Sequence, residues 1–252
     1  YNIALITSGL LMVFLSSFRY IFSPVMSELY GKNNINGFRT VYRSMCKWLF
    51  MIVFPVLLLM IFFPDNVLGI LFGKEAVKAS APFIILSLGF FLFSVFGLSN
   101  TVVFVVGKTK TLMLITSVCS VTNLVLNILL IPLIGINGAA MATSISFTLI
   151  SIMGVAFCYR YTGLYPVQRV YLKPTISGLA SLAVFYGLIK TVIANTSWYV
   201  LIPSLPLFIL LYGFLILAMK GLDKNDLMIL RTLERKTGMR SEFLRRIIRR
   251  FL

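Results

Sequence analysis

The sequence predicts an all-α membrane protein, a helical bundle that crosses a lipid bilayer several times. The chain is 59% hydrophobic and 12% charged, and it has no histidine, which is far from the composition of soluble globular proteins. Its apolar residues gather in charge-poor runs of about twenty residues, the length that spans a hydrocarbon core about 30 Å thick. The net charge of +16 lies beside these runs, so we expect the basic residues to meet anionic lipids and not nucleic acid.

Seven such runs are predicted to span the membrane. They cover residues 3–27, 48–64, 82–106, 111–131, 138–158, 174–194 and 198–219. Pro24 is expected to disrupt the first run near the interface, and Pro64 to end the second. The polar linker 29–46 carries Arg39 and Arg43 four residues apart, a spacing that predicts an interfacial helix leading into the second span.

Basic residues are distributed unevenly between the two sets of alternate connections. One set holds only Lys74 and Lys78, which Asp65 and Glu75 partly offset. The other set holds most of the positive charge, at Lys32, Arg39, Arg43, Lys47, Lys108, Lys110, Arg160, Arg169 and Lys173 and in the carboxyl-terminal tail. Under the positive-inside rule the second set is cytoplasmic, which predicts a multi-pass protein of the cell membrane with a cytoplasmic C-terminus.

The chain is predicted to have two parts, a transmembrane bundle over residues 1–219 and a cytoplasmic tail over 220–252. The tail is expected to contain an amphipathic helix that begins near Ser241. One face of this helix carries the four arginines Arg245, Arg246, Arg249 and Arg250, and the other face is apolar. Such a helix is typical of a membrane-surface anchor, at about 1 kcal/mol per basic residue near an anionic leaflet. The alternative is a solvated helix that packs on the protein's own cytoplasmic loops.

The connector between the fourth and fifth runs carries a motif. Asn127 is followed by Ile131-Pro132 and then by Gly-Ile-Asn-Gly-Ala-Ala at 135–140. This pattern resembles a turn of polysaccharide flippases, which belong to the multidrug/oligosaccharidyl-lipid/polysaccharide exporter superfamily. The segment 69–75 also resembles these flippases, although Ala76 and Val77 stand where the family usually has an aromatic residue.

The resemblance implies a fold and a function that hydropathy alone does not give. It implies twelve to fourteen helices in two lobes around a central cavity that opens alternately to the two sides of the membrane. The substrate would be a lipid-linked oligosaccharide or polysaccharide precursor. Because Tyr1 already lies inside an apolar run, the chain is interpreted as one lobe, the carboxyl-terminal portion, whose partner is a missing N-terminal half.

Arg19 is the charge that hydropathy least predicts. It lies about 9 Å inside the inner end of the first run at 1.5 Å per residue, where an arginine costs about 2.5 to 3.5 kcal/mol. Either it faces a hydrated cavity, or its side chain snorkels to the cytoplasmic interface against the tilt of helical side chains. In a cavity, its guanidinium would suit the diphosphate of a lipid-linked sugar, which it can hold with two parallel hydrogen bonds.

Three asparagines complete the candidate substrate-binding residues. Asn123 and Asn127 lie four residues apart on one helical face, and Asn100 lies in the third run. These amides either line a sugar-binding cavity or hydrogen-bond a neighbouring helix, and the sequence leaves both readings open.

Two other functions stay open, and neither metal nor cofactor is expected. A multidrug or cation antiporter of the same fold would need a membrane-buried carboxylate, and none lies in the middle of a predicted span. A glycan-assembly enzyme has little support, because no nucleophile motif is present. The three cysteines, Cys46, Cys119 and Cys158, lack the spacing of metal ligands and are expected to be small buried hydrophobes.

Overall fold

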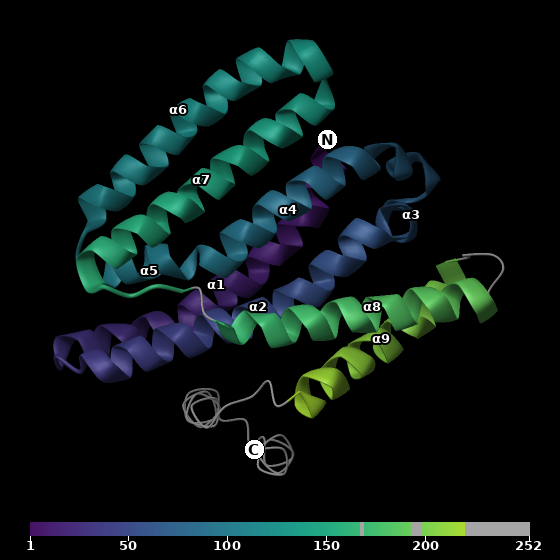
Figure 1. Cartoon of the computed structure of the whole chain (residues 1–252). Coiled ribbons are helices and arrows are strands. Elements are labelled where there is room, and N and C mark those ends of the chain that lie inside the picture. Colours follow the sequence, from purple (N-terminus) through teal and green to yellow (C-terminus); the bar gives the residue numbers. More distant parts are fainter. Residues whose placement is uncertain (167–168, 193–197, 220–252) are drawn as a thin grey trace. The chain divides into compact units, whose positions relative to one another are not determined.

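A computed structural model describes residues 1–166, 169–192 and 198–219 (Figure 1). Within these ranges every regular element is a helix, which confirms the all-α class. The chain divides into two compact units, Tyr1–Pro166 and Val167–Leu252, which are described separately.

The first unit contains five stretches that are long and apolar enough to cross a membrane. They are Asn2–Gly31, Ile35–Phe62, Lys74–Val105, Thr109–Ile134 and Ile136–Thr162. The helices of this unit are α1 (Asn2–Gly31), α2 (Ile35–Phe62), α3 (Pro64–Phe72), the 3-10 helix η1 (Lys74–Ala79), α4 (Ser80–Phe96), α5 (Leu98–Val105), α6 (Thr109–Ile134) and α7 (Ile136–Thr162). The first five predicted spans correspond to these stretches in order, so the chain is a multi-pass membrane protein.

In the second unit, α8 (Leu172–Val192) follows a short 3-10 helix, η2 (Arg169–Tyr171), and packs against α9 (Trp198–Ala218). The predicted sixth and seventh spans fall on α8 and α9. The total of seven spans stays a prediction, as does the boundary between residues 219 and 220. The predicted tail helix with Arg245, Arg246, Arg249 and Arg250 lies outside the described residues.

The first helix is longer than predicted, because α1 continues through Pro24 to Gly31. Proline lacks the N–H that would bond the Tyr20 carbonyl, but its fixed φ is compatible with a helix. Pro24 is exposed and shares a pocket with Tyr20, where solvent can replace the missing donor. The prediction that this proline ends the helix is therefore wrong.

The predicted interfacial helix in the linker 29–46 is the first part of α2 and not a separate element. The Asn34 side chain caps α2 by accepting the Gly37 N–H at 2.9 Å. Phe38 and Tyr42 on its apolar face are buried in the bundle, whereas Arg43 is exposed. Packing against the neighbouring helices, and not a membrane surface, therefore covers this face.

The third predicted span is interrupted at Gly97, which separates α4 from α5. The Gly97 carbonyl accepts the Asn100 N–H three residues on, at 3.1 Å, in place of the regular helical pattern. A side chain at position 97 would place its Cβ 2.5 Å from the Phe93 carbonyl oxygen and 2.7 Å from Leu15 Cδ2. Only glycine therefore fits this joint without displacing a neighbour.

The hairpin between α6 and α7 is tighter than the predicted ten-residue connector. Pro132 lies inside α6, and the reversal rests on Gly135 alone, whose φ is +59°. Gly138 already belongs to α7, where a Cβ would collide with the Leu130 carbonyl oxygen. This second glycine therefore allows close approach of the two helices and does not form the turn.

Small residues and hydroxyls line the contact between α1 and α4. Ser8 donates to the Phe83 carbonyl at 3.3 Å and lies the same distance from the Ser87 hydroxyl. Two helical turns beyond Ser87, Ser94 donates to the Leu11 carbonyl at 2.9 Å. Hydroxyl groups that bond a neighbouring backbone hold membrane helices close together. The two helices consequently stay in contact down to the Gly97 joint.

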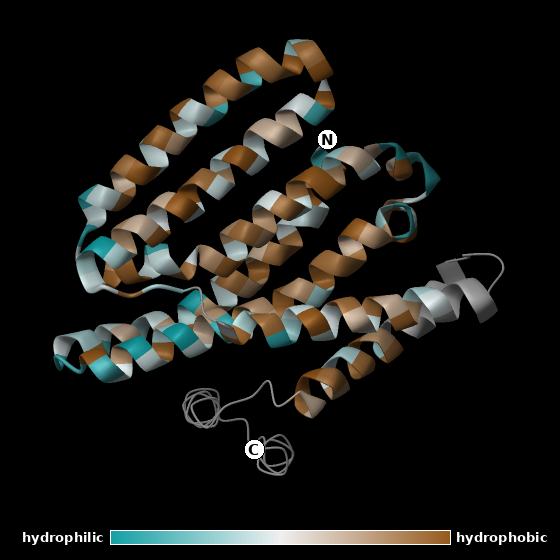
Figure 2. Cartoon of the chain, viewed as in Figure 1, coloured by the Kyte–Doolittle hydropathy of each residue, from teal (hydrophilic) through white to brown (hydrophobic). Residues whose placement is uncertain are grey.

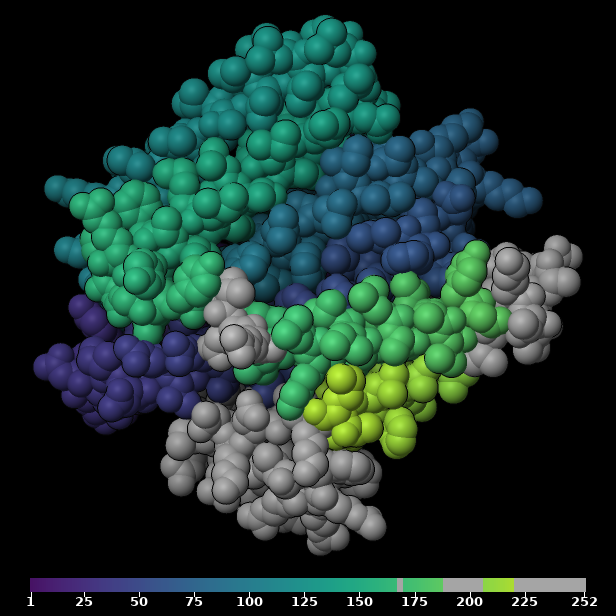
Figure 3. Space-filling view, viewed as in Figure 1, coloured from purple at the N-terminus to yellow at the C-terminus, as the bar shows by residue number. Residues whose placement is uncertain are grey.

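A second close contact joins α4 to α7. Helices α6 and α7 together form an outer layer of the first unit (Figure 3). Ser144 donates to the Ile85 carbonyl at 2.6 Å. Gly89 faces Ser144 so closely that a Cβ would lie 2.5 Å from the Ser144 Cα. The Phe147 ring meets Phe90 edge-on, with ring centroids 4.9 Å apart, and fills the space beside this crossing.

Hydrophilic residues of the first unit gather at the ends of its helices (Figure 2). One end carries the α1–α2 connection with Lys32, and the opposite end carries η1 with Lys74 and Lys78 (Figure 1). Lys47, one of the basic residues predicted to lie on the cytoplasmic side, is buried in the bundle with 5% of its surface exposed. Which end faces the cytoplasm stays a prediction of the charge distribution.

The Gly89 contact yields a stability test. Gly89→Ala is expected to lower the free energy of unfolding by about 1 to 3 kcal/mol, because the Ser144 backbone must shift to admit the methyl group. Gly9→Ala is the matched control, since nothing lies within 4 Å of its Cβ and alanine favours a helix. Thermal unfolding of the purified protein in detergent compares the two. Equal midpoints would contradict the close contact.

Candidate functional site

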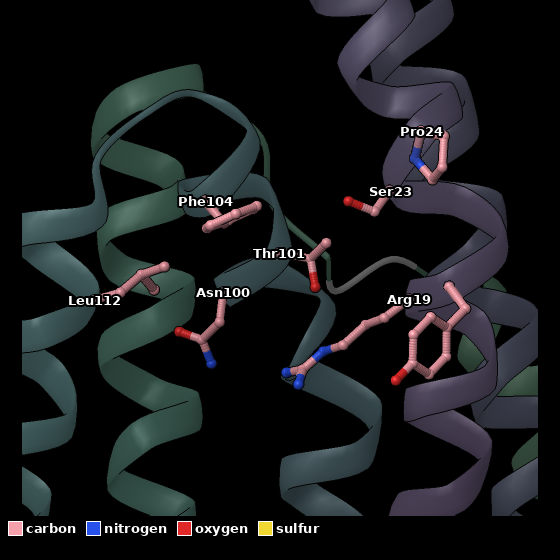
Figure 4. A pocket seen from close by; sticks show the side chains of 8 residues that line it. Arg19, Ser23, Pro24, Asn100, Thr101, Phe104 and Leu112 are labelled. Carbon is pink, nitrogen blue, oxygen red and sulfur yellow. The ribbon is translucent and has the colours of Figure 1, made fainter.

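A pocket of about 490 Å³ lies between α1, α5 and the start of α6 (Figure 4). Its walls combine polar and apolar side chains, namely Arg19, Tyr20, Ser23, Pro24, Asn100, Thr101, Phe104 and Leu112. Two of the four predicted substrate-binding residues, Arg19 and Asn100, thus lie in one pocket although they are far apart in the sequence.

Arg19 extends from α1 across the pocket toward α5 (Figure 4). It is half-buried, its Nη2 donates to the Gly97 carbonyl at 3.1 Å, and its Cζ lies 5.8 Å from the centre of the Phe93 ring. Its Nε is buried without a hydrogen-bond partner in the described part of the chain. Arg19 therefore lines a pocket, and the predicted choice between a hydrated cavity and snorkelling to the interface stays open.

Asn100 lies on the same side of the pocket as the guanidinium of Arg19 (Figure 4). Its Oδ1 is buried and accepts no hydrogen bond from the described residues. A Cβ at Gly154 of α7 would collide with that oxygen, so glycine at this position leaves room for the amide. The pocket thus contains a buried donor and a buried acceptor that both lack partners, which is uncommon away from binding sites.

Asn123 and Asn127 do not belong to this pocket. Asn127 Nδ2 donates to the Asn123 carbonyl at 2.9 Å and to its Oδ1 at 3.0 Å, so the two residues bond each other along α6. Asn123 lies eleven residues beyond the pocket residue Leu112, about 16 Å along the helix at 1.5 Å per residue. A contact between these amides and a sugar stays a prediction.

The sequence interpretation missed three polar members of the pocket, Tyr20, Ser23 and Thr101. Tyr20 is 83% exposed, the largest exposure among the large hydrophobic side chains of α1. A signal for this face existed, because Ser16, Tyr20 and Ser23 recur at helical spacing along an otherwise apolar run. Polar side chains repeated on one face of a membrane helix indicate a surface that faces protein or water and not lipid.

A second cavity of about 450 Å³ is almost entirely apolar. It runs along the crossing of α4 and α7 and is lined by Ile85, Leu88, Gly89, Leu92, Met141, Ser144, Ile145, Thr148, Leu149 and Ile152. The Ser144 hydroxyl in its wall bonds the Ile85 carbonyl. This cavity therefore resembles a surface suited to hydrocarbon chains, whereas the Arg19 pocket suits a polar ligand.

The described residues contain no group of three or more histidine, cysteine, aspartate or glutamate side chains that could hold a metal ion. Cys46, Cys119 and Cys158 are each buried and free, which agrees with their interpretation as small hydrophobic residues.

Tyr42 and Ser99 show how a buried polar pair is satisfied elsewhere in the bundle, because their hydroxyls lie 2.8 Å apart.

Comparison with known proteins gives consistent matches. The family model described as MatE matches residues 1–129. An uncharacterized membrane protein of Methanocaldococcus jannaschii is 26% identical over 221 residues, covering 88% of this chain and 43% of that protein. The probable low-salt glycan biosynthesis flippase Agl15 of Haloferax volcanii is 27% identical over 199 residues, covering 75% of this chain and 42% of that protein.

Among solved structures, the lipid II flippase MurJ in an inward closed conformation matches with a TM-score of 0.66 and 20% sequence identity. The match covers 85% of this chain and 46% of that chain. At this identity the likeness shows the fold. The chain spans less than half the length of each of these three proteins.

The unpartnered Asn100 oxygen predicts an unusual stability effect. Asn100→Leu is expected to leave the free energy of unfolding unchanged or to raise it by about 1 kcal/mol, because the substitution removes a buried acceptor that has no donor. Tyr42→Phe, which breaks the hydroxyl pair with Ser99, is expected to lower it by about 1 kcal/mol. Thermal unfolding of both variants checks this, and a strongly destabilised Asn100→Leu would show that the amide has a partner.

Proposed function

Because the chain belongs to the MatE family, within the multidrug/oligosaccharidyl-lipid/polysaccharide exporter superfamily, we propose that it is one lobe of a flippase for lipid-linked glycans. Its substrate would be an oligosaccharide or polysaccharide precursor on a lipid carrier. The relative Agl15, a probable flippase of glycan biosynthesis, supports this substrate class, and the shared fold with MurJ supports alternating access between two lobes.

The proposal rests on the incomplete hydrogen bonding of Arg19. A guanidinium has five N–H donors, and the described residues give this one a single hydrogen bond, to the Gly97 carbonyl. Holding such a group inside an apolar helix is costly, and a phosphate group would supply a compensating charge and acceptors for the free Nη donors. We therefore assign the phosphate or diphosphate of the substrate to Arg19.

The other polar groups of the pocket suit a sugar. Ser23 and Thr101 offer hydroxyl groups, and Asn100 offers an amide, all near the proposed phosphate position. Hydroxyl and amide groups pair readily with sugar hydroxyls, and an exposed aromatic ring such as Tyr20 can cover the apolar face of a sugar ring. The lipid tail would stay in the bilayer while the headgroup occupies the pocket.

The exposed face of α1 supports a second lobe as partner. Ile6, Val13 and Tyr20 recur along this face and are 66%, 58% and 83% exposed. In the proposed assembly a missing N-terminal half lies across this face and completes the cavity. The orientation with a cytoplasmic C-terminus in the cell membrane, and a tail that binds anionic lipids, belong to the same proposal.

The antiporter alternative gains nothing from the described residues. The three carboxylates within them, Glu28, Asp65 and Glu75, are all exposed. Glu28 and Glu75 form ion pairs with Lys32 and Lys78 at helix ends, so these residues offer no buried ion-binding carboxylate. The proposed role is transport without catalysis, in agreement with the flippase names of two of the relatives.

The proposal is tested by flipping in proteoliposomes that contain the full-length protein. A fluorescent polyprenyl-diphosphate N-acetylglucosamine is the probe, and its movement is followed by chemical quenching of the outer leaflet. Arg19→Ala is expected to reduce probe binding about ten- to hundredfold, because it removes a charged hydrogen-bond donor to the phosphate, and flipping at low probe concentration should fall with it.

Arg43→Ala is the matched control, since it removes the same charge from an exposed position on α2. It is expected to leave flipping within about twofold of the unmodified protein, as a surface charge contributes little. If Arg19→Ala flips the probe as fast as Arg43→Ala does, the assignment of the phosphate to Arg19 is wrong.

A further inference from the structure

We propose that Gly97 is a positioning residue for Arg19, because its carbonyl oxygen accepts one N–H of the guanidinium and so holds the group with its free Nη donors toward the phosphate. The inference rests on the proposed function and deepens it. It concerns the joint between α4 and α5, which the sequence interpretation treated as part of one continuous span.

The Gly97 carbonyl is accessible to a second helix. Inside a regular helix this oxygen would point along the axis toward the N–H four residues on. At the joint it accepts the Asn100 N–H, three residues on, and still receives Arg19 Nη2 at 3.1 Å from a different helix. A carbonyl oxygen has two lone pairs, so both donors can be accommodated.

The geometry of the Arg19 guanidinium determines which of its donors remain free. Nη2 and Nε lie on one edge of this planar group, and Nη1 and Nη2 form the other bidentate edge. Nη2 bonds Gly97, and Nε is buried beside it without a partner. One Nη2 donor is therefore used by the protein and Nε is enclosed by it, whereas the donors of Nη1 and the second donor of Nη2 stay available for two phosphate oxygens.

The contact between Arg19 and the carbonyl requires glycine at position 97. A Cβ at position 97 would lie 3.3 Å from Arg19 Nη2 and 2.7 Å from Leu15 Cδ2. Larger side chains would occupy the space through which the arginine reaches the carbonyl. Arg19 Cζ lies over the Phe93 ring, 5.8 Å from its centre, so the arginine is held by contacts from both α4 and the joint.

A preorganised arginine binds an anion more tightly than a free one, because less side-chain entropy is lost on binding. This explains why a charge that is costly in a membrane helix can serve as a binding group. The positioning contact comes from the backbone, and a substitution cannot remove it without also changing the shape of the joint. The inference therefore needs a test that separates positioning from general stability.

A double-mutant cycle on the full-length protein gives that separation. The probe is farnesyl diphosphate, and its dissociation constant is measured by calorimetry for the unmodified protein, Gly97→Ala, Arg19→Ala and the double variant. Gly97→Ala is expected to weaken binding about tenfold when Arg19 is present and less than about twofold when it is absent. Gly9→Ala, with open space at its Cβ, is the control and should change neither constant.

The outcomes distinguish this inference from the proposed function. If Arg19→Ala leaves farnesyl diphosphate binding unchanged, the phosphate site itself is wrong. If Arg19→Ala weakens binding but Gly97→Ala has the same effect in both backgrounds, the phosphate site stands and the positioning role of Gly97 is overturned.

A second measurement needs no substitution at the joint and covers the case in which Gly97→Ala does not fold. Protein labelled with carbonyl-13C glycine and guanidino-15N arginine should give a solid-state NMR dipolar contact between Gly97 and Arg19, which Arg19→Ala identifies by its loss. The contact is expected to persist at saturating farnesyl diphosphate. Its disappearance on binding would show that the anion displaces the carbonyl, which contradicts a positioning role.

Discussion

The close approach of α1 to α4 and α5 is the constraint on which the rest of the first unit depends. Ser8 and Ser94 satisfy their hydroxyls on the opposite helix, and no bulky side chain separates the two backbones at these points. In a bilayer the apolar surface of a helix gains little by leaving lipid, so packing and hydrogen bonding between helices must supply the association. The same contact brings Arg19 within hydrogen-bond distance of Gly97. The interface that holds these helices together therefore also forms part of the candidate site.

The physical difficulty of the pocket is a charge inside an apolar helix. Arg19 is tolerated because it bonds a backbone carbonyl and lies near an aromatic ring, both on the neighbouring helix segments. These contacts satisfy the guanidinium only in part. A group that is costly to hold and incompletely paired marks a functional site more clearly than a fully paired ion pair at a helix end, such as that between Lys32 and Glu28.

Much of the architecture could be predicted from hydropathy, because a run of about twenty apolar residues has few alternatives to a membrane helix. The first five spans and the candidate role of Arg19 followed from that reasoning. The prediction that Pro24 ends the first helix was wrong, because a proline exposed beside a pocket removes one hydrogen bond without ending the helix. The joint at Gly97 was not predicted, because glycine is common in membrane helices. Only the neighbouring Leu15 and Phe93 show why glycine is required here.

The asparagines show the limit of sequence reasoning about sites. Asn100 and the pair Asn123 and Asn127 have the same chemistry and lie in equally apolar runs. Only tertiary structure distinguishes them, by leaving the Asn100 oxygen unpaired beside Arg19 while the other two amides bond each other. Spacing along one helix predicted that Asn123 and Asn127 share a face, but no spacing could place Asn100 opposite α1.

The turn at Gly135 has a mechanical consequence. With a single residue between them and a glycine at their nearest crossing, α6 and α7 can neither separate nor slide without breaking the hairpin. We therefore expect the pair to move as one stiff arm about 26 residues long, whereas the stretch formed by α4 and α5 is interrupted at Gly97, near its C-terminal end. Any bending of the first unit would then concentrate at this interruption and carry the hairpin of α6 and α7 as one body.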